Sequence, residues 1–142
     1  MRLVMVMAVV ILAYQQTETS LSPSGTGCAV TRVIDGDTLR LTCAGMVHKV
    51  RLLGYDTPET YRPACRAEKR AGDAATEVLR AFVASGPVTQ VQFAGQDVYG
   101  RDLAHGQIGG RDATAMMLAS GLAQPYRGHQ RPDWCSLLVN AF

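Results

Sequence analysis

Runs of aliphatic and β-branched residues predict a β-hairpin near the start of the folded region. The stretch from Val30 to Leu41 is interrupted at Asp35-Gly36, a dipeptide that favours a two-residue turn between antiparallel strands. Counting pairs outward from this turn places Cys28 opposite Cys43. We therefore predict two paired strands that are joined by a disulfide between these two cysteines.

The pattern beyond the hairpin predicts three more strands and at least two helices. Met46–Leu53 has the composition of a third strand, and small or apolar residues recur at three- and four-residue steps from Cys65 to Ala84, which is typical of an amphipathic helix. Val88–Phe93 and Arg101–Ile108 follow as strands, and Asp112 can cap a short helix through Ser120. This order predicts an α+β, mainly β fold: a five-stranded, partly open Greek-key barrel of the OB type with one longer and one or two short helices.

The amino terminus has a different pattern. Met1-Arg2 precedes the apolar run from Leu3 to Ala13, as in a secretory signal peptide, and this run is too short to cross a bilayer comfortably as a helix. The alternative is an uncleaved membrane anchor through residues 1–14 followed by a polar tether. Both interpretations predict an exported protein, secreted or periplasmic, with a leader over residues 1–27 and one folded domain over residues 28–142.

An even number of cysteines behind an export signal favours disulfides over free thiols. With Cys28 and Cys43 paired in the hairpin, the second bridge joins Cys65 to Cys135. A zinc site is disfavoured because the four positions are scattered and lack C-x-x-C spacing. The net charge of +2 does not by itself indicate a polyanionic partner, so any nucleic-acid function must rest on local geometry.

One segment concentrates the chemistry-bearing side chains. Arg51 to Thr60 contains an arginine, two carboxylates at Asp56 and Glu59, and Pro58, whose fixed φ makes the loop rigid. A loop held in this way can position ligands. The alternative is an ordinary solvated Asp-Thr-Pro turn.

Asp37 lies on the wrong face for a solvated carboxylate. Strand alternation places it with Leu39 and Leu41, and a carboxylate on an apolar face needs a cation or a dense set of hydrogen bonds. Together with Asp56 and a backbone carbonyl it provides hard oxygen ligands that suit Ca²⁺ or Mg²⁺. The alternative is that Asp37 only caps the hairpin. Arg101, in Tyr99-Gly100-Arg101, would add to Arg51 a second forked donor for phosphate oxygens.

Three motifs in this order, Ile34-Asp-Gly-Asp-Thr38, Arg51-Leu-Leu-Gly-Tyr-Asp-Thr-Pro-Glu-Thr60 and Tyr99-Gly-Arg101, resemble the staphylococcal nuclease (thermonuclease) family. The resemblance runs from about Val30 to Ala123. It implies a Ca²⁺-dependent endonuclease that hydrolyses phosphodiester bonds of DNA and RNA, breaking the bond to the 5′ oxygen and leaving 3′-phosphate products.

The resemblance also implies a role for each site residue. Asp37 and Asp56 would be carboxylate ligands of Ca²⁺, and Thr57 would add its backbone carbonyl. Glu59 would act on the attacking water. Arg51 and Arg101 would hold the phosphate of the substrate. Tyr99 and Tyr126 would also bind the substrate, Tyr126 by stacking on a base.

Two other interpretations compete with this one. A non-catalytic OB-fold module that binds single-stranded nucleic acid would not need water-activating carboxylates and would favour more stacking aromatics than the 6% present, so the enzyme is preferred. An interaction module tethered to a membrane through residues 1–14 is the third. The expected partners are DNA and RNA, preferably single-stranded, and the expected state is a monomer.

Overall fold

The computed structural model of the protein describes residues 27–139. The predicted signal peptide or membrane anchor, up to residue 26, lies outside the described residues. Within residues 27–139, no helix combines the length and the apolar character that crossing a membrane would require.

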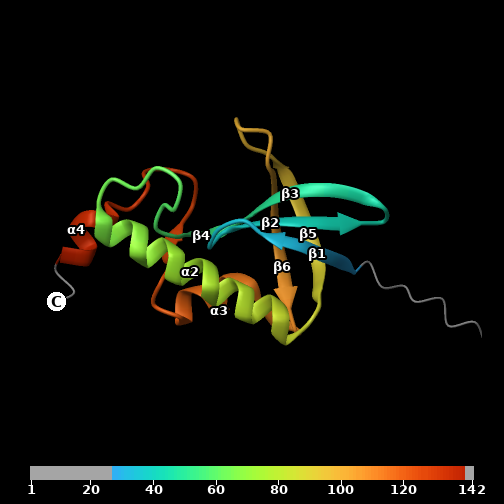
Figure 1. Ribbon diagram of the computed structural model, residues 1–142. Helices are drawn as coiled ribbons and strands as arrows, with labels where there is room; N and C mark the ends of the chain where they lie inside the picture. The colour runs from blue at the N-terminus through green and yellow to red at the C-terminus, as the bar shows by residue number, and fades with distance from the viewer. Residues whose placement is uncertain (1–26, 140–142) are drawn as a thin grey trace, which may run out of the picture.

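Five strands form a closed barrel (Figure 1). Along the sheet they follow the order β3-β2-β1-β5-β6, and the parallel pairing of β3 with β6 closes the ring. This is the strand order of an OB-type barrel, so the predicted fold class is confirmed, although the barrel is closed where we expected it to be partly open. The bounds are β1 (Cys28–Val33), β2 (Thr38–Cys43), β3 (Met46–Leu52), β5 (Val88–Gln96) and β6 (Asp102–Ile108).

The first hairpin confirms the predicted disulfide and corrects the predicted turn. Cys28 pairs with Cys43 in the ladder and is bonded to it. The connection is not the two-residue turn at Asp35-Gly36, because β1 ends at Val33 and β2 begins at Thr38. A register shift between Val30 and Arg32 compensates for the longer loop and restores the predicted pairing at the end of the hairpin.

Within residues 27–139, helices α2 and α3 lie beside the barrel, and α4 lies against α2 (Figure 1). The long helix α2 (Arg66–Ser85) starts at Cys65, whose Sγ accepts a hydrogen bond from the Glu68 amide. The short helix α3 (Ala113–Ala119) is capped by Asp112, as predicted. The last helix, α4 (Trp134–Val139), was not predicted. Helices α2 and α3 contribute Leu79 and Met117 to one apolar core with barrel residues that include Leu39, Leu41, Val50 and Ile108.

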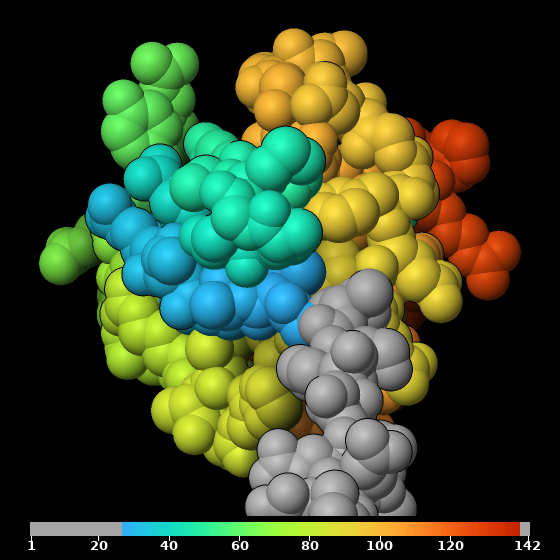
Figure 2. Space-filling model, turned by 90° about the vertical axis from the view of Figure 1, so that its right-hand side faces the viewer, coloured from blue at the N-terminus to red at the C-terminus, as the bar shows by residue number. Residues whose placement is uncertain are grey.

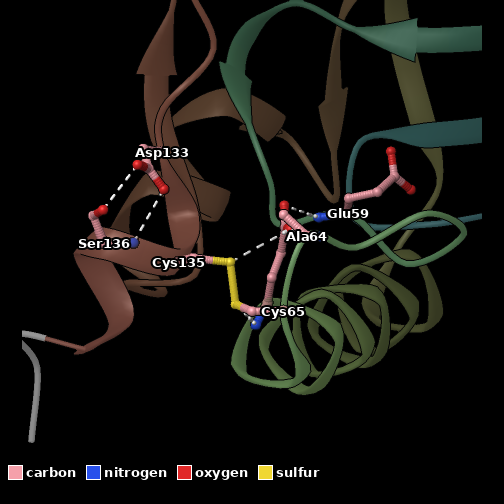
Figure 3. Close-up of a disulfide and its surroundings, with 7 residues drawn as sticks. Glu59, Ala64, Cys65, Asp133, Cys135 and Ser136 are labelled. Carbon is pink, nitrogen blue, oxygen red and sulfur yellow. Dashed lines mark hydrogen bonds between the residues drawn. A yellow bond between two sulfur atoms is a disulfide. The ribbon is translucent and has the colours of Figure 1, made fainter.

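A small second ribbon lies beside the barrel. Strand β4 (Gly54–Asp56) pairs antiparallel with β8 (Gln124–Tyr126). The two-residue β7 (Arg111–Asp112) turns back and pairs antiparallel with the end of β6. The ribbon of β4 and β8 brings the carboxy-terminal segment to Asp56. The second predicted disulfide, Cys65–Cys135, then ties that segment to the start of α2 (Figure 3).

Candidate active site

One open cleft of about 1260 Å³ contains every side chain for which we predicted a role in binding or catalysis. It lies at the end of the molecule where the segment near residue 60 and the turn between β5 and β6 project from the surface (Figure 2). Strands β3 and β4, the loops beside them and the carboxy-terminal segment all contribute to its wall. The predicted residues that line it are Asp37, Arg51, Asp56, Thr57, Glu59, Tyr99, Arg101 and Tyr126.

Arg51 bridges the two carboxylates that were predicted to bind metal. It is buried at the end of β3, and its Nη2 lies 3.2 Å from Asp37 Oδ2 and 3.0 Å from Asp56 Oδ1. Its Nη1 donates to the backbone carbonyls of Leu52 and Tyr55 at 3.3 and 3.4 Å. The guanidinium is therefore fixed on the protein and brings the two aspartates together.

Asp37 is buried, as strand alternation predicted, and is 7% exposed. Thr38 Oγ1 donates to its Oδ1 at 2.8 Å. Burial raises the pKa of Asp37 from 3.8 to about 7, although the nearby charge of Arg51 opposes the shift, and the charges of Asp35 and Asp56 raise it further. The ionised form of Asp37 is therefore costly at this position, and a further cation would stabilise it.

Asp56 is fully buried and its carboxylate is saturated with donors. Oδ1 accepts from Arg51 Nη2 at 3.0 Å and from Arg131 Nε at 3.1 Å. Oδ2 accepts from Arg131 Nη2 at 3.3 Å and from the indole Nε1 of Trp134 at 3.0 Å. Arg131 Nε also lies 3.3 Å from Oδ2. Each carboxylate oxygen has two lone pairs, so these four donor nitrogens use the whole acceptor capacity of the group.

Arg131 and Trp134 are functional candidates that sequence reasoning missed. Besides its contacts with Asp56, Arg131 donates from Nη2 to the Thr57 carbonyl at 3.3 Å, and its Nη1 lies 3.8 Å from Glu59 Oε2. Burial alone would lower the pKa of Arg131, but the charges of Asp56, Glu59 and Asp37 outweigh burial and raise it. The available signal was the predicted Cys65–Cys135 bridge, which implied that the residues before Cys135 lie near the catalytic loop.

Glu59 lies in a loop that is hydrogen-bonded to a side chain of α2. Its Oε1 accepts from the amides of Thr60 and Tyr61, both at 2.8 Å, so Oε2 is the oxygen that these two amides leave available. Its own amide donates to Glu68 Oε1 at 3.1 Å, and Glu68 Oε2 accepts from the Ala64 amide at 2.6 Å (Figure 3). The buried Glu68, in the first turn of α2, thus fixes both ends of the loop.

Arg101 is oriented by the turn that precedes it. Asp97 Oδ1 accepts from the amides of Tyr99 and Arg101, while Arg101 Nε lies 2.7 Å from Asp97 Oδ2. Burial alone would raise the pKa of Asp97, but these hydrogen bonds and the charge of Arg101 lower it. Arg101 Nη1 donates to Thr38 Oγ1 at 3.2 Å, so it is linked through Thr38 to Asp37.

The two predicted tyrosines both lie over arginines. Tyr99 is 81% exposed at the tip of its turn, with its ring centre 5.8 Å from the guanidinium carbon of Arg101. The centre of the Tyr126 ring, in β8, lies 5.2 Å from the guanidinium carbon of Arg51, and the Tyr126 hydroxyl donates to the His129 carbonyl. Tyr99 is free to stack on a base, whereas Tyr126 already packs on the central arginine.

The donor set is of the kind that a hard cation prefers. Asp37, Asp56, the Thr57 carbonyl and Glu59 offer only oxygen ligands, which fits Ca²⁺ in chemical character. Across the described part of the chain, however, no group of three or more acidic, histidine or cysteine side chains is arranged to hold a metal ion. At this position the guanidinium groups of Arg51 and Arg131 lie between the carboxylates.

Comparison with known proteins shows similarity to one family. Residues 49–136 match the family model described as staphylococcal nuclease homologue. The thermonuclease of Staphylococcus intermedius is 31% identical over 130 residues, which cover 86% of this chain and 77% of that protein.

Two Bacillus subtilis (strain 168) proteins are also similar over 96 residues each. They are the SPbeta prophage-derived endonuclease YokF, at 36% identity, and the endonuclease YncB, at 35% identity. In both cases the match covers 66% of this chain. The chain spans only 32% and 44% of the length of these two relatives.

Proposed function

We propose that this chain, which belongs to the staphylococcal nuclease family, is a Ca²⁺-dependent endonuclease that hydrolyses DNA and RNA, preferably single-stranded. Membership of the family and the named nuclease relatives make it a nuclease, a hydrolase of phosphodiester bonds. The calcium requirement, the choice of substrate, cleavage of the 5′ P–O bond with 3′-phosphate products, and action as a monomer are parts of the proposal. The observation that carries it is the meeting of two arginines, Glu59 and two buried aspartates in one open cleft.

The two arginines supply the electrostatics that the reaction needs. Attack on a phosphodiester builds negative charge on the non-bridging oxygens, and donors that are already oriented stabilise this charge without reorganising. Arg101 is oriented by Asp97 and Thr38, and Arg51 by two backbone carbonyls. Forked guanidinium donors match phosphate oxygens in two-point fashion.

Glu59 is suited to accept the proton of the attacking water. Its Oε1 is occupied by two backbone amides, so Oε2 is the atom that would orient the water and receive the proton. The backing of its loop by Glu68 keeps the carboxylate in place. Replacement of this one group should therefore affect turnover far more than folding.

Asp37, Asp56 and the Thr57 carbonyl are the residues that we propose to hold Ca²⁺. When bound, the ion would supply positive charge to the phosphate oxygens and a site at which water is polarised. The surroundings of Asp37 support the proposal: burial raises the pKa of this carboxyl to about 7 by removing water from its ionised form, and a bound cation would compensate for that loss.

The open cleft and its exposed aromatic favour an unpaired strand. Bases that are not held in a duplex can stack on Tyr99, which projects 81% exposed beside Arg101. The two disulfides are compatible with an extracellular protein, and we propose export as a secreted or periplasmic enzyme, either free or tethered through residues 1–14.

The decisive test is cleavage of denatured DNA by the wild type and by Glu59→Gln, in Ca²⁺ and in EGTA. We expect cutting by the wild type in Ca²⁺ only, and a loss of about 100-fold or more in the variant, as for removal of a general base. Glu77→Gln, the same change at an exposed position of α2, is the matched control and should leave turnover unchanged. Tight DNA binding without cutting under either condition would instead favour a nucleic-acid-binding module.

A further inference from the structure

The guanidinium of Arg131 occupies the position that the proposed cation needs. Two of its nitrogens contact the Asp56 carboxylate at 3.1 to 3.3 Å, and one of them also donates to the Thr57 carbonyl at 3.3 Å. Asp56 and the Thr57 carbonyl are two of the three ligands proposed for Ca²⁺; the third is Asp37. Arg131 also approaches Glu59 Oε2 at 3.8 Å, so its charge is centred on the acidic loop.

We infer that Arg131 and the divalent cation compete for Asp56 and the Thr57 carbonyl, so that Arg131 acts as the built-in counter-ion of the metal-free enzyme and must leave before the metal binds. The inference rests on the proposed calcium site. It assigns to Arg131 a positioning role that the motifs of the sequence did not indicate.

Simultaneous occupancy is excluded by capacity and by charge. The four donor nitrogens around Asp56 already use both of its oxygens, and Ca²⁺ would require one of these oxygens at about 2.3–2.6 Å. The ion would then lie against a guanidinium that uses the same oxygen. Two cations at that separation repel strongly in a site shielded from water.

Arg131 is the donor that can leave. Its side chain is 48% exposed, whereas that of Arg51 is 9% exposed and held by two backbone carbonyls as well. The third donor, Trp134, is buried, and it is the first residue of α4, next to the disulfide-bonded Cys135. Rotation of Arg131 into the cleft therefore disturbs less packing than movement of either neighbour.

A second consequence concerns the metal-free protein. Without Arg131, Arg51 would be the one guanidinium among the contacts described above that serves both Asp37 and Asp56. A buried carboxylate whose charge is not compensated lowers the stability of the fold. Arg131 should therefore stabilise the metal-free state and contribute little once the cation has replaced it. A residue that is merely structural would contribute equally in both states.

The test is a thermodynamic cycle on the full chain. Wild type, Arg131→Gln and Arg131→Lys are compared by calorimetric Ca²⁺ titration and by melting temperature in EGTA and in saturating Ca²⁺. For Arg131→Gln we expect a Ca²⁺ dissociation constant about tenfold lower than that of the wild type, within the usual range for coupled sites. Its melting temperature should fall in EGTA and match the wild type in saturating Ca²⁺. Arg131→Lys, which keeps the charge and loses the fork, should lie between the two.

Arg127→Gln is the matched control, because Arg127 lines the same cleft and makes none of the contacts with Asp56 described above. It should change the dissociation constant much less than Arg131→Gln. An equal fall of the Ca²⁺ dissociation constant in both variants would mean that any loss of positive charge in the cleft strengthens binding, and would overturn the inference. Equal dissociation constants for wild type and Arg131→Gln would overturn it as well. Equal destabilisation of Arg131→Gln in both buffers would also overturn it.

The same titration separates this inference from the proposed function. Calcium binding with the same affinity in wild type and Arg131→Gln removes the inference and leaves the proposed function in place. Binding by Arg131→Gln with none by the wild type supports the inference. No binding by any of the variants overturns the inference and the calcium requirement together.

Discussion

At the scale of single residues, Asp56 connects the parts of the site. It is fully buried, yet its donors come from β3, from the loop after β8 and from α4. An ionised carboxylate out of contact with water is tolerated only when charges and hydrogen bonds compensate for its lost hydration. The position of the carboxy-terminal segment is therefore coupled energetically to the catalytic loop.

Trp134→Phe should show how much this coupling contributes. The change keeps a large apolar ring and removes the indole N–H that donates to Asp56 Oδ2 at 3.0 Å. A hydrogen bond to a charged group contributes about 1.5–3 kcal/mol, and we expect a loss of that size in the free energy of unfolding, measured by urea denaturation in EGTA. Circular dichroism should follow unfolding, because the variant lacks the single tryptophan of the chain.

Tyr55→Phe provides the comparison for this measurement. The buried Tyr55 hydroxyl donates to the neutral carbonyl of Gly36 at 3.0 Å, and such a bond contributes about 0.5–1.5 kcal/mol. We expect the smaller loss here. A Trp134→Phe variant as stable as the wild type would indicate that Arg51 and Arg131 satisfy the carboxylate without the indole.

Sequence reasoning located the residues that belong to local patterns and missed those that depend on tertiary contacts. Asp37 was placed correctly on the inner face because Leu39 and Leu41 share its alternation. The same alternation would place Thr38 on the opposite, outer face, but Thr38 is 1% exposed and its hydroxyl accepts a hydrogen bond from Arg101 of a distant turn. Arg131 contacts Asp56 across 75 positions, and no periodicity or motif encodes that contact.

At the scale of elements, α2 is the support of the catalytic loop. Glu68 holds the amides of Glu59 and Ala64, and one turn later Gly72 lets the helix approach the loop backbone. A Cβ at position 72 would lie 2.7 Å from the Pro58 carbonyl oxygen and 2.9 Å from that of Glu59. The distance between helix and loop is thus set by the absence of a side chain.

Gly72→Ala should therefore damage the protein although alanine favours helices. The gain in helix propensity is about 1 kcal/mol, but the new methyl meets backbone atoms that cannot rotate away, and overpacking of this kind costs about 1–3 kcal/mol. We expect no net gain in urea stability and a clear loss of turnover on denatured DNA, because the loop that carries Glu59 must shift.

Gly106→Ala is the matched control for this effect. It makes the same change at a buried glycine of β6, where the nearest atom would be 3.8 Å from the new Cβ, an ordinary contact. Its turnover should equal that of the wild type. A Gly72→Ala variant with full turnover would show that the loop tolerates the shift and that Glu68 alone positions it.

The elements that sequence reasoning missed are the short ones. The strands of the barrel and α2 are long enough to show a period of two or of about 3.6, and they were predicted close to their observed bounds. β4 and β8 have three residues each, too few for any periodicity, and α4 has six. They form because they pair or pack with distant segments, and these three elements carry Asp56, Tyr126 and Trp134 to the site.

At the scale of the whole molecule, the two disulfides serve different regions. Cys28–Cys43 lies inside the first hairpin of the barrel, whereas Cys65–Cys135 ties the carboxy-terminal segment to the start of α2 (Figure 3). The first closes a separation of 15 residues and the second one of 70. Only the second belongs to the segment that supplies Arg131 and Trp134 to Asp56.

Removal of each bridge should therefore separate stability from site integrity. From the entropy of loop closure, we expect the free energy of unfolding to fall by about 3 kcal/mol in Cys28→Ser/Cys43→Ser and by about 4 kcal/mol in Cys65→Ser/Cys135→Ser. The second loss is partly offset, because serine is a better amino-terminal cap for α2 than the Sγ of Cys65. The two losses, measured by urea unfolding, should be similar. The emission of Trp134 under native conditions should differ between the two variants. We expect a red shift and stronger acrylamide quenching only in Cys65→Ser/Cys135→Ser, because the segment that carries Trp134 then loses its covalent link to the start of α2. Unchanged emission in that variant would mean that the non-covalent contacts fix the segment by themselves, and that the bridge stabilises the fold without positioning the site.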